Sequence, residues 1–339
     1  MNTKTQVIIG GGVSFLCLYF ALRGVNLREV LSILTTVKIS SVVLMTVVFI
    51  FSFVLRALRW QLLLAPVKTI SVHSLFASTM IGFLANNVLP LRAGEVVRGY
   101  AIARTEKISV SSALATLVLE RLLDGIVISL FMVALLVVFP FPAWLINLNY
   151  VLLAIYCTGI GVSIGLLWAK GKENLWERIT RAFPTFVREK TETLMGNFAS
   201  GLQILGDKRK IFWVGVLSLA HWFVIALYYW IVFQACGFSL PFLAAFVVLA
   251  VLTLGIMLPA APGYVGNFQY FTVVALSLFS VSKEDALGLS FVAHAGQFIP
   301  VTIIGLFYVI RQGLTVSDLQ GKESPAALGV KATPDAVRT

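Results

Sequence analysis

The most constraining feature of the sequence is a stretch of 72 residues, Ile211–Ser282, that contains no Lys, Arg, Asp or Glu. A membrane-spanning helix needs about 20 mostly apolar residues, so this stretch alone is long enough for more than two spans. Unpaired backbone groups in hydrocarbon cost several kcal/mol each, which favours helices for such long apolar runs. The stretch therefore predicts an all-α membrane protein.

The composition of the whole chain supports the same fold class. Hydrophobic residues make up 59% of the chain and charged residues only 12%, whereas soluble proteins have about 25% charged residues. So few charges cannot cover a water-facing surface, which excludes a soluble enzyme, a disordered chain and a nucleic-acid-binding module. No nucleic-acid partner is expected despite the net charge of +11, because cytoplasmic loops of membrane proteins collect Lys and Arg.

Other uncharged runs bring the prediction to about six full spans and two broken, re-entrant segments in a polytopic bundle. These runs are residues 5–22, 39–55, 69–91, 125–169 and 286–310. Between the first two, Leu27, Val30, Leu31 and Leu34 are spaced as on an amphipathic helix, which we expect at the membrane interface.

Two apolar runs are interrupted by proline and glycine. Proline removes a helix donor and glycine permits positive φ angles, so both interruptions should break their helices and are candidates for gating. The residues concerned are Pro90 and Gly94 in the first run, and Pro259, Pro262, Gly263 and Gly266 in the second.

The interruptions belong to a sequence repeat. The two Leu-Pro pairs are 169 residues apart, the preceding spans 172 and the following spans 178. The distribution of Lys and Arg gives the two units, about 39–139 and 211–310, opposite orientations. An inverted repeat with paired broken helices is typical of transporters, whose substrate site lies between the breaks.

The connection between the units, residues 170–210, carries nine Lys and Arg and is expected to be a cytoplasmic amphipathic connector. We expect residues 1–311 to form a single membrane domain, and 312–339 a disordered cytoplasmic tail. The protein would then lie in the inner, cytoplasmic membrane, with both termini on the cytoplasmic side.

Charged residues inside the first unit are the strongest functional signal, because charges within spans are costly. They occur in three groups: Arg56 and Arg59; Arg92, Glu95 and Arg98; and Glu120, Arg121 and Asp124. If the groups converge, they carry a net charge of +2, which the phosphate of a substrate would neutralise through bidentate Arg contacts. Two purely structural explanations stay open. Arg56 and Arg59 could be anchors that extend to the membrane interface, and the third group could be a structural ion-pair network.

Within its apolar runs, the second unit offers only neutral polar groups. Asn267 and Gln269, beside the second break, are its best candidates for substrate contact, ahead of His294 and Gln297; Asn87 is the neutral candidate of the first unit. The three cysteines lie within apolar runs and have no metal-ligand spacing. We expect no metal and no cofactor.

The sequence resembles the flippase-like membrane domain family, the transmembrane region of lysylphosphatidylglycerol synthases, over about residues 5–311. Four blocks carry the resemblance: Arg59-Trp60, Asn87-x-x-Pro90-x-Arg92-x-Gly94-Glu95-x-x-Arg98, Glu120-Arg121-x-x-Asp124-Gly125 and Pro262-Gly263-x-x-Gly266. The resemblance implies movement of phospholipids or lipid-linked substrates between leaflets, in a stand-alone member without the aminoacyl-transferase domain.

One residue departs from the family's pattern. Gln269 stands where the family often has a carboxylate, which removes that acid as a candidate for proton coupling.

The functional prediction is a flippase for a phospholipid or polyprenyl-phosphate glycolipid, whose head group is held by the Arg/acid cluster. No nucleotide-binding Gly-rich motif is present, so the driving force would be a gradient or ion coupling. Two alternatives remain: an integral membrane enzyme acting on a lipid phosphate, and a scaffold for a separately encoded transferase. The substrate, the direction of transport and the oligomeric state stay open.

Overall fold

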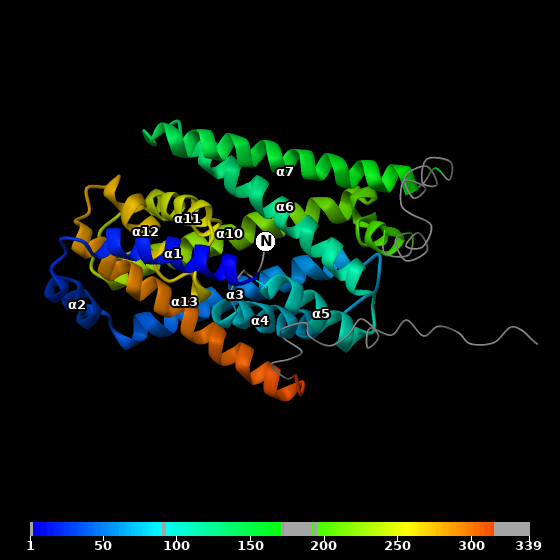
Figure 1. The fold of residues 1–339 in the computed structure, drawn as a ribbon, viewed down its shortest axis with the longest axis horizontal. Coiled ribbons are helices and arrows are strands. Elements are labelled where there is room, and N and C mark those ends of the chain that lie inside the picture. Colours follow the sequence, from blue (N-terminus) through cyan, green and yellow to red (C-terminus); the bar gives the residue numbers. More distant parts are fainter. Residues whose placement is uncertain (1–2, 90–92, 171, 173–191, 193–194, 315–339) are drawn as a thin grey trace, which may run out of the picture.

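A computed structural model describes residues 3–89, 93–170, 172, 192 and 195–314 of the chain, without the side chains of residues 3–9. The regular elements that it assigns within these ranges are all helices, and they form one bundle (Figure 1). Those of the N-terminal half are α1 (Thr3–Leu22), α2 (Leu27–Thr36), α3 (Ile39–Leu64), α4 (Val72–Val88), α5 (Gly94–Glu106), α6 (Val110–Leu135) and α7 (Ala143–Lys170). Those of the C-terminal half are the 3-10 turn η2 (Gln203–Gly206), α10 (Lys208–Ala235), α11 (Phe242–Ile256), the 3-10 turn η3 (Pro262–Tyr264), α12 (Asn267–Ser277) and α13 (Lys283–Arg311).

The expected polytopic bundle is confirmed. By length and composition, α3, α7, α10 and α13 can each cross a membrane, and α1 with α2 forms a fifth, bent candidate. Helix α6 is as long as α3, with 26 residues, but it carries three charges near its middle, so composition alone does not mark it as a span.

The packing reproduces the sequence repeat. Helix α3 packs along α10, and α4 packs along α13 as α11 packs along α6. The Phe49 ring of α3 contacts the Tyr228 ring of α10, whereas Arg59, further along α3, donates a hydrogen bond to Ser218, earlier in α10. The two helices are therefore antiparallel. Since α3 and α10 are the corresponding first helices of the two units, the units are inverted relative to each other.

The first break separates α4 from α5. Pro90 and Arg92 lie outside the described residues, but α4 ends at Val88 and α5 begins at Gly94, as the sequence predicted. The Asn86 side chain accepts a hydrogen bond from the Gly94 amide at 2.9 Å, and a Cβ at Gly94 would overlap the Gly82 carbonyl. Glycine therefore lets the start of α5 fold back onto α4.

The second break separates α11 from α12. Helix α11 ends at Ile256, before Pro259, and Pro262 begins the short turn η3. Gly263 and Gly266 have φ angles of 68° and 90°, which non-glycine residues adopt only with strain. Both predicted helix breaks are thus present.

The first two helices cover the second unit. Helix α1 packs on α12, and α2 turns away from α1 by 90° to pack on α13. The expected amphipathic helix is present, but its apolar residues divide between two faces. Val30 is buried in the protein, whereas Leu27, Leu31 and Leu34 are exposed.

Helix α7 lies at the outer edge of the bundle beside α6 (Figure 1). The connector that follows it is only partly described: residues 173–191, within the expected amphipathic connector, and the tail 315–339 lie outside the described residues. The end of the connector is held against α6, where Leu202 is buried and the Ser112 hydroxyl donates to the Asn197 carbonyl at 2.8 Å.

Candidate functional site

The charged groups of the first unit converge in one buried cluster. Helix α3 contributes Arg56 and Arg59, α5 contributes Glu95 and Arg98, and α6 contributes Glu120, Arg121 and Asp124. Arg92, the remaining predicted member, lies outside the described residues. The helix break before Gly94 brings α5 back across the bundle, which places its two charges beside those of α3 and α6.

Glu120 is the centre of the cluster and is completely buried. Its Oε1 lies 3.2 Å from a terminal nitrogen of both Arg56 and Arg59, 2.9 Å from Arg98 and 2.7 Å from Arg121. Arg98 adds a second hydrogen bond of 3.1 Å to Oε2 and stacks over the Trp60 ring at 3.9 Å. One carboxylate thus joins three helices.

Asp124, one turn after Glu120, ties the cluster to the second unit. Its Oδ1 accepts hydrogen bonds from Arg59 at 2.5 Å and from the Trp222 indole of α10 at 3.1 Å. Its Oδ2 lies 3.3 Å from Arg56 and 3.2 Å from Arg121. The cluster is therefore part of the contact between the two units.

The described members of the cluster do not balance in charge: four guanidinium groups meet three carboxylates, leaving +1. The buried Nε atoms of Arg56, Arg59 and Arg98 have no hydrogen-bond acceptor among the described residues. An uncompensated buried charge costs several kcal/mol. The cluster can therefore accept an additional anion.

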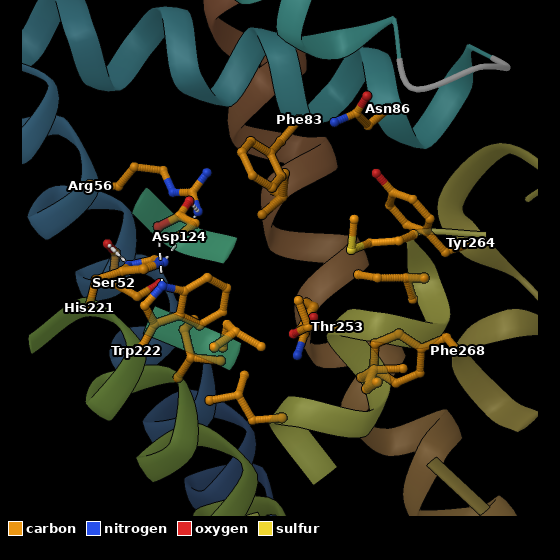
Figure 2. A pocket seen from close by; sticks show the side chains of 18 of the residues that line it. Ser52, Arg56, Phe83, Asn86, Asp124, His221, Trp222, Thr253, Tyr264 and Phe268 are labelled. Atoms are coloured by element: carbon orange, nitrogen blue, oxygen red, sulfur yellow. Dashed lines mark hydrogen bonds and ion pairs between the residues drawn. The ribbon is translucent and has the colours of Figure 1, made fainter. Parts of the chain in front are cut away.

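A cavity of about 420 Å³ opens beside the cluster, between the two units. Arg56, Glu95, Arg121 and Asp124 line its charged side, and most of the remaining wall is apolar. Figure 2 shows Arg56, Asp124, His221 and Trp222 on one side of this pocket, with Tyr264 and Phe268 opposite. The volume lies within the range of small-molecule sites, about 300–1,000 Å³.

The predicted site residues divide into three sets. Arg56, Asn87, Glu95, Arg121 and Asp124 line the cavity. Arg59, Arg98 and Glu120 are buried behind its wall and hold the lining charges in place, so direct contact with a substrate would need the cluster to open.

Asn267 and Gln269 form the third set, because the structure places neither of them in the cavity wall. Asn267 accepts a hydrogen bond from Ser14 of α1 at 3.2 Å. Gln269 bonds to the Gly266 amide and to His294. Both side chains hold the second break together, and the geometry gives their expected substrate contact no support.

Three further residues line the cavity: His221 and Trp222, which the sequence did not single out, and His294, which it placed after Asn267 and Gln269. The His221 ring lies 3.3 Å from Arg56 and donates from Nδ1 to the Ser52 carbonyl at 2.9 Å. A histidine in the middle of an apolar run was the available signal, since ionisable residues within spans are functional candidates by default.

The described residues contain no group of three His, Cys, Asp or Glu side chains arranged to hold a metal ion. Within the same residues the three cysteines are unpaired thiols.

Comparison with known proteins identifies the family. A model of the lysylphosphatidylglycerol synthase transmembrane region matches residues 7–305. The chain belongs to this family. The resemblance noted in the sequence is thereby confirmed.

Curated relatives are distant and archaeal. Glycosyltransferase AglD of Haloferax volcanii is 26% identical over 90% of this chain, which spans only 54% of the length of that protein. A UPF0104 membrane protein of Methanothermobacter thermautotrophicus is 24% identical over 81% of this chain and 87% of its own length. UPF0104 membrane protein MJ1595 of Methanocaldococcus jannaschii is 21% identical over 94% of this chain and 98% of its own length. No solved structure matches significantly.

Proposed function

We propose that the protein is a flippase that moves a lipid with an anionic head group between the two leaflets of the membrane. The observation that carries the proposal is the cavity between the units, which combines an apolar wall with Arg56 and Arg121 at one side. Arg binds phosphate through paired, charge-assisted hydrogen bonds. A phosphate there would neutralise the residual +1 of the described cluster.

The inverted repeat supports a transport role. In transporters of this kind, substrates bind near the bilayer midplane, and one unit rocks against the other around the site. The cavity lies between the two broken segments, with Asn87 of the first unit and Gly263 of the second in its wall. The head group would occupy the cavity while the acyl or prenyl chains stay in the surrounding lipid.

We infer the orientation from the charges of the connections. The connection between α7 and α10 is rich in Lys and Arg, whereas the one between α6 and α7 has none. This distribution supports an orientation with both chain ends on the cytoplasmic side of the inner membrane. The head group would then be captured from the cytoplasmic leaflet.

Reconstitution in liposomes tests the proposal, with head-group-labelled phosphatidylglycerol and a polyprenyl-phosphate analogue as probes. We expect the protein to increase the rate at which the probes become accessible to an external quencher. Arg121→Gln should lower that rate at least about tenfold, because one charged hydrogen bond is worth about 1.5–3 kcal/mol. Arg121 suits the test because its side chain is 39% exposed.

Arg311→Gln, at the end of α13, is the matched control and should retain the wild-type rate. Equal rates in protein-containing and protein-free liposomes would contradict the proposal, as would full activity of Arg121→Gln.

A second candidate function is chemistry on a lipid-linked sugar, alone or with a separate transferase. Its support is the name of one relative, glycosyltransferase AglD, of which this chain spans about half the length. Incubation of the purified protein with a polyprenyl-phosphate sugar decides between the candidates. Release of phosphate or transfer of the sugar would favour an enzyme. In a separate experiment, co-purification of the protein with a transferase would favour a scaffold.

A further inference from the structure

The second break is held to α13 by one imidazole. The His294 Nε2 lies 2.8 Å from the Gly263 carbonyl of η3, and its Nδ1 lies 3.0 Å from the Gln269 amide nitrogen in the first turn of α12. The ring also stacks on Phe268, with centroids 4.4 Å apart and planes within 7°. His294 therefore contacts the turn inside the break and the helix that follows it, and it lines the cavity as well.

The hydrogen bonds fix which nitrogen of His294 carries the proton. The Gly266 amide donates to Gln269 Oε1 at 2.8 Å, so the Gln269 side-chain nitrogen must be the atom that faces His294. That nitrogen is a donor, so Nδ1 of His294 accepts and is unprotonated. The Gly263 carbonyl is an acceptor, so Nε2 carries the hydrogen. The arrangement specifies a neutral imidazole in the Nε2–H form.

A second proton would break this chain of hydrogen bonds. Protonated Nδ1 would face the Gln269 amide hydrogens, and two donors repel. Rotating the Gln269 amide would restore the bond to His294 but turn its NH₂ group against the Gly266 amide. Protonation must therefore loosen either the contact between α12 and α13 or the start of α12.

The groups in direct contact with His294 are neutral. No ion pair or hydrogen bond joins it to a charged side chain within the described part of the chain. Its neighbours from other elements are the rings and amides of α12 and the backbone of η3, and Gln297, one turn on in α13, bonds to the Tyr229 hydroxyl of α10. The face of Phe268 favours a cation stacked on it.

The charged groups that share the cavity with His294 are Arg56, Glu95, Arg121 and Asp124, and the titratable phenols are Tyr156, Tyr229 and Tyr264. His221 differs from His294 because it contacts Arg56 directly at 3.3 Å. A proton on His221 would face a positive charge, which disfavours it.

We propose that His294 is a proton-binding site whose occupation releases the second broken segment. In the neutral state the ring clamps η3 and α12 to α13. In the protonated state the clamp opens, and the positive ring adds to the attraction of the cavity for an anion. The proton site stands on the hydrogen-bond geometry, and its coupling to head-group uptake rests on the proposed function.

The chain contains only three histidines, which makes a direct test practical. Full-length protein labelled with ¹⁵N-histidine is studied by NMR in detergent, with His73→Gln and His221→Gln assigning the His294 signal by elimination. We expect the Nε2–H form of His294 near neutral pH and the opposite, Nδ1–H form of His221. An Nδ1–H form of His294, or no change of its signal between about pH 8 and pH 5, would overturn the proposal.

Hydrogen exchange tests the release of the clamp without relying on transport. After correction for intrinsic rates, amides of residues 257–270 should exchange faster as His294 becomes protonated. His73→Gln should keep this response and His294→Gln should lose it. If the exchange rates of these amides in the wild-type protein do not change when His294 becomes protonated, the proposal is overturned. This outcome does not depend on whether His294→Gln folds.

Head-group binding tests the coupling. Linkage requires that, if the anion favours protonated His294, its affinity increases as pH falls, by at most about tenfold per pH unit for one proton. Affinity for a short-chain phosphatidylglycerol is measured across the same pH range. If the affinity does not change with pH while the hydrogen-exchange response is present, the coupling alone is overturned. If no lipid binds at any pH, the proposed function is overturned but the proton site is not.

Discussion

At the residue scale, the buried ion cluster positions the charged side chains of the proposed site. Glu120 contacts four guanidinium groups and has no exposed surface, and Asp124 shares three of those groups. Buried ion pairs contribute little to stability relative to apolar residues, but removing one partner leaves an unpaired buried charge. The cluster therefore adds little net stability, but the fold depends on each charge keeping its partners, and Arg56 and Arg121 are fixed at the cavity wall.

We predict that Glu120→Gln destabilises the protein by about 3–5 kcal/mol, because it leaves the Arg side chains with one carboxylate fewer. The matched control is Glu106→Gln, at a partly exposed pair with Lys68, which should cost at most about 1 kcal/mol. Thermal unfolding in detergent measures both variants. Similar losses for the two would show that the cluster lacks the predicted energetic role.

The sequence predicted these charges well but not their neighbours. Charges within an apolar run must find partners, so Arg56, Glu120 and Asp124 could be identified without a structure. His294 was only a lesser neutral candidate in the sequence, because its contacts with Gln269 and Gly263 arise from the fold. Asn267 and Gln269 were favoured for their closeness to the break, although that closeness reflects a structural role.

At the element scale, the two broken helices give the bundle its site. The proline and glycine pattern predicted both breaks because these residues act locally on the backbone. The direction in which each half-helix returns could not be read from the sequence. It depends on close approaches such as Gly94 to Gly82 and Gly266 to Ser14 of α1.

We predict that Gly266→Ala is strongly destabilising. Its φ of 90° would cost a non-glycine residue about 1–3 kcal/mol, and a Cβ would overlap the Ser14 backbone. Gly215→Ala, in open space within helix α10, is the matched control and should leave stability unchanged or raise it by up to about 1 kcal/mol. Equal thermal stability of the two variants in detergent would show that the second break tolerates a different backbone.

At the scale of the whole molecule, the inverted repeat places a one-sided charge cluster against a neutral unit. The offsets between the sequence segments predicted the repeat, because each unit reuses the order span, broken segment, span. The antiparallel packing of α3 on α10 turns that order into a shared cavity. Which helices cover the cavity from outside depends on long-range packing that leaves no periodic signal in the sequence.

The most direct test of the account is photolabelling with an anionic phospholipid that carries a diazirine in its head group. Full-length protein in liposomes is irradiated, and the labelled residues are mapped by mass spectrometry. We predict adducts on cavity residues such as Ile128, Thr253 and Phe298, competed by unlabelled phosphatidylglycerol and reduced in Arg121→Gln. Adducts confined to exposed residues of α7, such as Trp144 and Trp168, would contradict a head-group site in the cavity.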